Sequence, residues 1–323
     1  MRVRTTAGLA VAAILAVASP SIPSAAQSPF SRIVVFGQSL SDPGNAFALR
    51  GGTNTPPDYL LDPLLVPGAP YARGGHHFSN GATWVEQFAR SLGLAGSVRP
   101  AYQSSSDATN FAVAGARARD DGSNVNLPDQ VDAFLQRTGG AAPADALYVI
   151  EFGGNDIRDA LVAYLVGGPP AAAAVLRDAN IAIAQAINTL HGAGARRFLV
   201  WKAPNVGLTP AIGILNRTSP GATQLATGLT QAFNLGLDGV VAQLEAVLPG
   251  INKIARLDAW RVLNDLVADP IAFGLTDVTS PCITPYVPPF TCGTPDEFLF
   301  WDGIHPTKAV HDIIATEAAT VLR

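Results

Sequence analysis

The amino-acid sequence predicts an α/β domain with three layers, in which helices cover both faces of a mostly parallel sheet. Short runs of apolar residues, many of them β-branched, alternate along the chain with longer segments of helical periodicity. Several of these runs lack polar alternation, as is typical of parallel strands that are buried on both faces. Polar residues follow glycine turns at the ends of several runs, which predicts a ligand site at the carboxyl edge of the sheet.

Residues 1–26 have the features of a cleavable secretory signal peptide. Two arginines within the first four residues precede an apolar run over 7–18, and three small residues come before Gln27. The apolar run is too short and wrongly flanked for a membrane span. We therefore expect cleavage after Ala26, export to the periplasm or the medium, a single domain over 27–323, and no transmembrane segment in the mature chain.

Composition argues against two classes of function. The formal net charge is −4 and the sequence has no basic cluster, so the electrostatic footprint of a nucleic-acid-binding protein is missing. No H-E-x-x-H motif occurs and the histidines are not spaced as ligands, so we expect neither a metal nor another cofactor. Nothing in the sequence indicates an oligomeric state.

The first predicted strand is followed by a candidate nucleophile. Residues 33–36 (I-V-V-F) are typical of a buried strand, and Gly37 permits a tight turn after it. Ser39 is therefore expected at the carboxyl edge of the sheet. Since most serines near strand ends only cap the next helix, Ser39 gains its significance from a second segment.

That second segment is the loop 301–307 (W-D-G-I-H-P-T), which supplies Asp302 and His305 three residues apart. A serine hydroxyl becomes a good nucleophile when a histidine accepts its proton. The histidine works best when a carboxylate fixes its tautomer and stabilises the imidazolium. We therefore predict a catalytic triad of Ser39, His305 and Asp302.

Two features of the N-terminal half have alternative interpretations. Ser79 is a rival nucleophile, but no strand precedes it, and we interpret it as a helix cap or turn residue. The segment 46–77 is rich in proline and glycine, yet five apolar residues lie between Leu60 and Val66. It either contributes to an acyl-chain pocket or a lid, or packs as a satellite cluster on the core.

The rest of the chain alternates between the two types of secondary structure. Further strands are predicted at 109–117, in the first part of 146–156, at 197–201 and at 252–257, and helices at 80–92, 169–190, 223–248 and 307–322. The segment 202–219 is predicted to be irregular. Glycine turns end the strands near Gly115 and Asn155, which brings these two residues to the same sheet edge as Ser39.

The two cysteines, Cys282 and Cys292, lie in a proline-rich segment. An even number of cysteines in an exported chain indicates a disulfide, the alternatives being two free thiols or a pair of metal ligands. We expect the bond to close a short loop upstream of Asp302.

Four blocks in the order F-G-Q-S-L-S-D, N-F-A-V-A-G-A, G-G-N-D and D-G-I-H-P-T resemble those of the SGNH or GDSL lipase and esterase family. The resemblance spans nearly the whole mature chain and is greatest with the bacterial branch of secreted phospholipases, lecithinases and hemolysins. It implies a flavodoxin-like sheet, no metal, and an acyl-enzyme intermediate that water releases. By position, it implies the roles of nucleophile for Ser39, general base for His305 and orienting carboxylate for Asp302. It also implies an oxyanion hole formed by the backbone N–H groups of Ser39 and Gly115 and the side-chain amide of Asn155.

This resemblance implies a secreted serine ester hydrolase that acts on lipid or other acyl esters. A carbohydrate O-acetyl esterase and an acyltransferase are alternatives on the same fold. One departure is Gln38, where the family motif has aspartate, and it raises a third alternative, a catalytically weak binding protein. A glutamine carbonyl can still accept a backbone N–H bond, though more weakly than a carboxylate. We therefore expect a Gln38→Asp variant to be folded and at least as active as the native chain.

Overall fold

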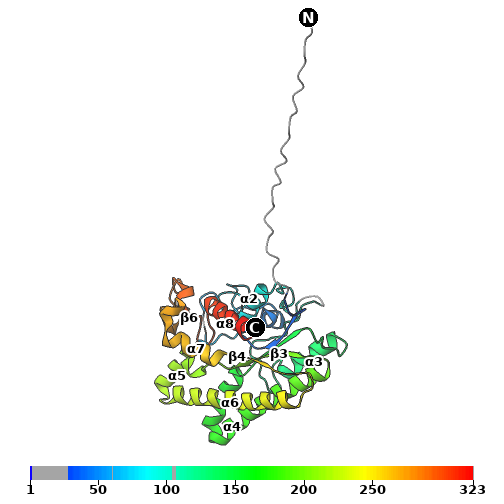
Figure 1. Cartoon of the computed structure of the whole chain (residues 1–323). Helices are drawn as coiled ribbons and strands as arrows, with labels where there is room; N and C mark the ends of the chain where they lie inside the picture. The colour runs from blue at the N-terminus through cyan, green and yellow to red at the C-terminus, as the bar shows by residue number, and fades with distance from the viewer. Residues whose placement is uncertain (2–27, 60, 104–106, 323) are drawn as a thin grey trace.

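The computed structural model describes Met1 and residues 28–59, 61–103 and 107–322 (Figure 1). The predicted signal peptide, apart from Met1, and Leu60 of the predicted apolar segment lie outside the described residues. Within the described part of the chain, a parallel sheet lies between two layers of helices. The predicted three-layer α/β class is therefore confirmed.

The sheet has parallel strands in the order β1-β2-β3-β4. Their bounds are Ile33–Gly37, Leu147–Glu151, Arg197–Lys202 and Ala255–Asp258. The segment predicted as a strand at 109–117 lies on the outer side of β1, where Phe111 donates its backbone N–H to Val35 O at 2.8 Å. It pairs with β1 through an isolated bridge between Asn110 and Val35 and does not form a full strand. The segment 109–117, which is second in the sequence, thus lies outside β1, which is first. This is the flavodoxin-like strand order that the resemblance implies.

Helices cover both faces of the sheet. One face carries α3 (Leu127–Arg137), α4 (Gly154–Gly192) and α6 (Ala222–Val247), and the other carries α2 (Trp84–Ser91), α7 (Ala259–Ala268) and α8 (Lys308–Val321). In Figure 1, α4 and α6 lie below the sheet, and α2 and α8 lie above it. The connections contain the short helices α1 (Asn45–Leu49) and α5 (Pro210–Thr218) and the 3-10 turns η1 (Val206–Leu208), η2 (Pro270–Phe273) and η3 (Pro295–Glu297).

Alternate side chains of each strand enter two separate cores. In β1, Val34 and Phe36 contact the core beneath α3, α4 and α6, whereas Ile33 and Val35 contact the core beneath α2, α7 and α8. Both faces of the strand are therefore buried, which explains why its sequence shows no polar alternation. The covered faces leave the carboxyl ends of the strands as the place where polar side chains can gather.

Helix α4 consists of two helical segments that meet at Gly168, where φ is 69°. Pro169 and Pro170 begin the second segment, as predicted, because proline has no N–H to donate and suits a first helical turn. The first segment, which starts at Gly154, is missing from the sequence-based prediction. By length and composition α4 could span a membrane, but the kink divides it and α4 packs against α6.

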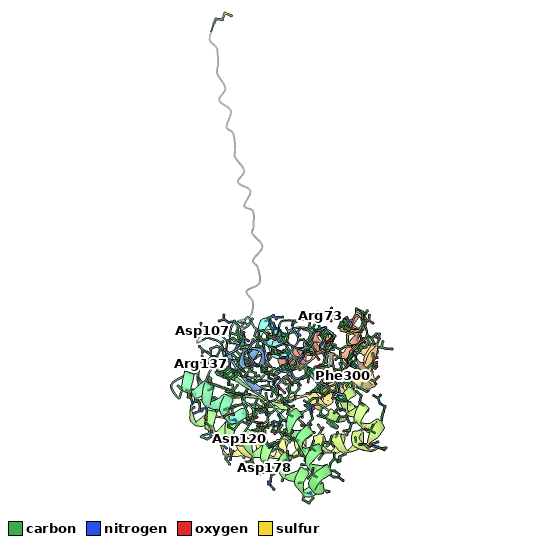
Figure 2. The ribbon with its side chains drawn as sticks, turned by 180° about the vertical axis from the view of Figure 1, so that it is seen from behind. Arg73, Asp107, Asp120, Arg137, Asp178 and Phe300 are labelled. Atoms are coloured by element: carbon green, nitrogen blue, oxygen red, sulfur yellow. A yellow bond between two sulfur atoms is a disulfide. The ribbon has the colours of Figure 1, made fainter. Side chains whose placement is uncertain are left out.

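Other short helices, among them α3, α5, α7 and η1, are also missing from the prediction. Helix α3 begins with a capping box formed by Asn126 and Asp129, and α5 and η1 lie in the segment predicted to be irregular. Helices α3, α5 and α7 span only two or three turns and η1 is a single turn, so their apolar faces give a weak periodic signal. Arg137, at the end of α3, donates to Ala108 O at 2.9 Å and to Ala101 O at 2.7 Å, which ties this helix to the segment beside β1 (Figure 2).

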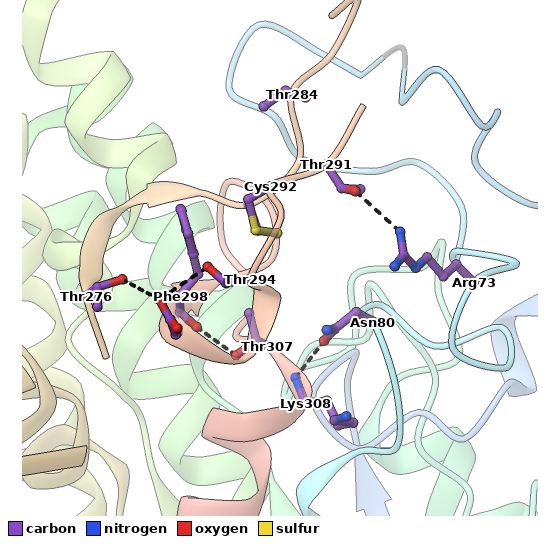
Figure 3. The surroundings of a disulfide bond; sticks show 12 residues. Arg73, Asn80, Thr276, Thr284, Thr291, Cys292, Thr294, Phe298, Thr307 and Lys308 are labelled. Atoms are coloured by element: carbon purple, nitrogen blue, oxygen red, sulfur yellow. Dashed lines mark hydrogen bonds between the residues drawn. A yellow bond between two sulfur atoms is a disulfide. The ribbon is translucent and has the colours of Figure 1, made fainter. Parts of the chain in front are cut away.

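A small parallel sheet, β5 (Asp277–Pro281) with β6 (Phe298–Phe300), leads into the loop 301–307. The predicted disulfide is present and joins Cys282, directly after β5, to Cys292, with the two Cα atoms 4.9 Å apart (Figure 3). Cys282 donates its backbone N–H to Phe300 O at 2.9 Å. The disulfide-bonded loop is therefore attached to the strand that positions Asp302.

Candidate active site

Ser39, His305 and Asp302 form one line of hydrogen bonds at the carboxyl edge of the sheet. Ser39 follows β1, and the other two residues lie in the loop between β6 and α8. His305 Nε2 is 2.9 Å from Ser39 Oγ, and His305 Nδ1 is 2.7 Å from Asp302 Oδ2. Asp302 and His305 are buried, whereas Ser39 is half-buried. This geometry allows the serine hydroxyl to give its proton to an imidazole that a buried carboxylate holds in place.

The carboxylate of Asp302 is fixed from both of its oxygens. Oδ1 accepts the backbone N–H groups of Ile304 at 2.9 Å and His305 at 2.8 Å. Oδ2, which lies next to the imidazole, also accepts the hydroxyl of Tyr71 at 2.9 Å. Burial, followed by the charge of Asp302, raises the pKa of Tyr71 well above its ordinary value, so the phenol stays a donor. Tyr71 could not be predicted from the sequence, because no local pattern connects it to the loop that it contacts.

Tyr71 belongs to a small aromatic cluster beneath the loop 301–307. Its ring meets those of Tyr59 and Trp301 edge to face, at centroid distances of 5.5 and 5.8 Å. Leu65 packs against this cluster, and its carbonyl accepts the backbone N–H of Gly303 at 2.8 Å. A side chain at Gly303 would overlap the backbone of Leu64 and Leu65, so glycine is required there. Of the two interpretations of the apolar segment, the satellite cluster is therefore the one that the described residues support.

The predicted oxyanion-hole residues lie near one another but differ in their surroundings. Asn155, in the first turn of α4, lines the same pocket as Ser39 and donates one Nδ2 proton to Ala116 O at 2.9 Å. An amide nitrogen carries two protons, so one remains for a ligand. Gly115 has φ of 90°, which glycine adopts without strain, and is not among the residues that line this pocket.

Gln38 makes contacts that the sequence did not reveal. Its side-chain Nε2 donates to Glu151 Oε1 at 3.0 Å, and its Oε1 accepts the backbone N–H of Asn155 at 3.2 Å. Glu151, the last residue of β2, is fully buried, and burial raises its pKa to about 7. A second carboxyl group therefore lies directly beneath the turn that carries Ser39.

Ser79, the rival nucleophile of the sequence analysis, and Asp156 both have structural roles next to the site. The hydroxyl of Ser79 is buried and donates to Pro306 O at 2.8 Å, which supports its interpretation as a turn residue. Asp156, beside Asn155, accepts the backbone N–H of Ala118 at 2.9 Å, and burial raises its pKa to about 6. Both side chains hold segments that border the site.

A cavity of about 50 Å³ opens beside Ser39 and His305. A more apolar cavity of about 40 Å³ adjoins it on the side of α7 and α8. Both cavities are lined by Leu40, Pro204, Thr209 and Ile304. Among the described residues of the apolar segment, 61–66 line neither cavity, so the predicted contribution of this segment to an acyl pocket is not observed.

Arg158 supplies a positive charge to the cavity beside Ser39. It is half-buried, and within the described residues it forms no ion pair. Its Nη1 lies 3.4 Å from Asn155 Oδ1. Burial, followed by the nearby Arg117, lowers the pKa of the guanidinium, as expected for a cation that is not offset by a bonded carboxylate. Arg158 was not predicted as a site residue from the sequence.

A serine, a histidine and an aspartate that are hydrogen-bonded in this order, with an amide donor in the same pocket, form the arrangement that is typical of serine hydrolases. The fold is consistent with that class, since the site lies at the carboxyl edge of a parallel sheet. The family model described as GDSL-like Lipase/Acylhydrolase matches residues 33–318. The chain therefore belongs to the GDSL-like lipase and acylhydrolase family.

Similar proteins are known from plants and bacteria. The chain is 26% identical to the GDSL esterase/lipase At5g63170 of Arabidopsis thaliana, with 93% of each chain covered. It is 23% identical to Lipase 1 of Photorhabdus luminescens, over 91% of this chain and 50% of that protein. An extracellular lipase structure from Streptomyces rimosus aligns at 16% identity with a TM-score of 0.39, over 89% of this chain and 99% of that chain. The family, together with the relatives from Arabidopsis and Photorhabdus, identifies the chain as a carboxylic ester hydrolase.

Proposed function

We propose that this chain is an exported serine esterase or lipase with Ser39 as nucleophile, His305 as general base and Asp302 as the residue that orients the histidine. The continuous line of hydrogen bonds from Ser39 Oγ to Asp302 Oδ2 carries this proposal. We further propose that residues 27–323 form the mature protein in the periplasm or the medium. Gln27 as the first residue of the exported protein would support that boundary.

The reaction then proceeds in two steps. Ser39 Oγ attacks the ester carbonyl while His305 Nε2 accepts the hydroxyl proton, and a tetrahedral oxyanion forms. The carbonyl re-forms as the carbon–oxygen bond to the alcohol breaks, and the alcohol leaves with the proton from His305. Water next attacks the acyl-enzyme with His305 again accepting a proton, and the carboxylic acid is released as Ser39 recovers its hydrogen.

The developing oxyanion is stabilised by neutral donors in this proposal. These donors are the backbone N–H groups of Ser39 and Gly115 and the second Nδ2 proton of Asn155. The bond from Asn155 to Ala116 O supports this role, since it holds the amide in one orientation before the substrate arrives. One such preorganised donor is worth about 3 to 4 kcal/mol of the barrier.

We propose that the acyl chain enters the apolar cavity that adjoins the one at Ser39. The shared wall formed by Leu40 and Ile304 supports this path, because an acyl group on Ser39 would contact both. Val262 of α7 lines the inner part of this cavity. A Val262→Phe variant should therefore lower kcat/KM for p-nitrophenyl octanoate and leave p-nitrophenyl acetate unchanged. Equal losses on both esters would contradict this path.

Arg158 favours esters that carry an anionic group near the scissile bond, as in a phospholipid. A half-buried guanidinium without an ion pair among the described residues can bind a phosphate or carboxylate oxygen of a substrate. This observation supports a phospholipase-like specificity. An Arg158→Gln variant should lower kcat/KM about tenfold for 4-butyryloxybenzoate, since a hydrogen bond to a charged group is lost. The methyl ester of the same substrate is the neutral control and should be unaffected.

The basic activity is tested by turnover of p-nitrophenyl butyrate. The native protein should show turnover that is lost in a Ser39→Ala variant with an unchanged melting temperature. A Ser79→Ala variant is the matched control and should keep its turnover. Turnover that survives in Ser39→Ala would contradict the assignment of the nucleophile.

A further inference from the structure

Glu151 is a buried carboxyl group with an unusual set of partners. It is the residue of β2 that pairs with Gly37 of β1, and it is fully buried. Gln38 donates to it twice, with its backbone N–H to Oε2 at 3.1 Å and with its side-chain Nε2 to Oε1 at 3.0 Å. The hydroxyl of Ser41 is a third partner, and within the described residues no cation pairs with Glu151. Since burial of a carboxylate is costly without such donors, the Gln38 contacts hold Glu151 in place.

The other end of the Gln38 amide contacts the oxyanion side of the site. Its Oε1 accepts the backbone N–H of Asn155 at 3.2 Å. Gln38 therefore uses its side chain as a donor to β2 and as an acceptor from α4 at the same time. It is also the residue directly before Ser39, so it connects the nucleophile turn to the first turn of α4.

Two glycines enclose this contact. A Cβ at Gly37 would lie 3.0 Å from Glu151 Oε2, and a Cβ at Gly154 would lie 3.0 Å from Gln38 Nε2. Larger residues at either position would push the two side chains apart. Gly37 and Gly154 therefore pack closely around the contact between Gln38 and Glu151.

We propose that Glu151 supplies the carboxylate that the family motif has at position 38, and that Gln38 is a positioning residue that links Glu151 to Ser39 and Asn155. This inference rests on the proposed roles of Ser39 and Asn155. A carboxylate at position 38 could not donate to Glu151, and the two like charges would be buried in contact. In contrast to the expectation from the sequence, this inference predicts that Gln38→Asp is less active than the native chain.

An exchange of the two residues tests the inference. The variants are Gln38→Glu, Glu151→Gln and the double exchange, all of which keep the side-chain lengths. Gln38→Glu buries two carboxyl groups in contact and should lower kcat on p-nitrophenyl butyrate about a hundredfold, with little change in KM. In the double exchange the amide at 151 can donate to the carboxylate at 38, and that carboxylate can still accept the N–H of Asn155. The double exchange should therefore recover kcat to within about fivefold of the native protein.

The melting temperature is measured on the same four proteins, because it reports the coupling even if the proposed roles of Ser39 and Asn155 fail. Gln38→Glu should melt lower than the native protein, and the double exchange should recover most of that loss. If Gln38→Glu does not fold, recovery of folding and kcat in the double exchange supports the inference. A double exchange that is as impaired as Gln38→Glu, or a Gln38→Glu protein with native kcat, would overturn it.

Discussion

Tyr71 donates its hydroxyl to Asp302 Oδ2 at 2.9 Å, the same oxygen that lies 2.7 Å from His305 Nδ1. Tyr71 and Asp302 are 231 positions apart in the chain, so this bond joins the long segment after α1 to the C-terminal loop. The segment thus contributes to the site through the phenol of Tyr71, and the described residues 61–66 line neither cavity there. Because the imidazole and the phenol share one carboxylate oxygen, Tyr71 fixes the position from which Asp302 orients His305.

A Tyr71→Phe variant should keep the fold and lose activity. The ring still fills the cluster with Trp301, but one hydrogen bond to a charged group is removed, which is worth about 1.5 to 3 kcal/mol. We expect kcat to fall about tenfold with KM nearly constant. Tyr59→Phe is the matched control, since Tyr59 packs in the same cluster. Equal losses of kcat in the two variants would show that the cluster acts only through stability.

His305→Ala should be as severe as Ser39→Ala, and Asp302→Asn should be milder. The histidine moves the proton in both steps, whereas the aspartate orients the ring and stabilises the imidazolium. Measurement of kcat for the three variants gives the order directly. Asp302 Oδ1 accepts two backbone N–H groups of the loop 301–307, so its loss could also unfold this loop. If Asp302→Asn loses as much kcat as the other two variants, a melting curve will show whether the loop has lost its structure.

Stability should depend on pH through His311. Its ring is fully buried beneath α2, its Nδ1 accepts the backbone N–H of Trp84 at 3.1 Å, and burial lowers its pKa to about 3. The unfolded chain therefore binds a proton between pH 6.5 and about 3 that the folded chain does not. The stability contribution of His311 is present above pH 6.5 and is lost as the pH falls towards 3.

A His311→Gln variant isolates this contribution, since the amide oxygen can still accept the Trp84 N–H but does not titrate. We expect the unfolding free energy of the native protein to fall faster on acidification than that of the variant. Urea unfolding at several pH values checks this difference. If the unfolding free energies of the two proteins fall in parallel with pH, then His311 is protonated as readily in the folded chain as in the unfolded chain.

The disulfide between Cys282 and Cys292 should stabilise the exported protein. Its loop has a sequence separation of 10, and a loop of that size is worth about 2 to 3 kcal/mol in the chain-entropy model. We expect the double Cys→Ser variant to melt at a lower temperature than the native protein. Ser39 should still act as the nucleophile in this variant. Thiol titration of the unreduced, denatured protein should find no free thiol, and two free thiols would contradict the pairing.

The parts of the site that the sequence predicts are those encoded by short local motifs. Ser39 follows an apolar strand and a glycine, and Asp302 and His305 lie three residues apart on one loop. The resemblance to a known family then relates these motifs to one another. The strands β1 and β2 were predicted for a similar reason, since their apolar runs are continuous and are followed by glycine turns.

The remaining parts depend on contacts between distant segments. Tyr71 and Glu151 lie 231 and 113 positions from the residues that they hold, and no periodic pattern connects them. The role of Gln38 could not be predicted for the same reason, because its partner is the last residue of another strand. Short helices such as α5 and α7 gave too few turns for a clear apolar period, so tertiary packing decides their formation.

The most direct test of the proposed mechanism is to label the native protein with a serine-directed organophosphonate and to map the modified peptide. We predict one modified residue, Ser39, and a loss of labelling in Ser39→Ala and of nearly all labelling in His305→Ala, since the histidine activates the hydroxyl. Labelling should also abolish turnover of p-nitrophenyl butyrate in proportion to the modified fraction. Modification of Ser79, or full turnover in a protein labelled at Ser39, would contradict the account.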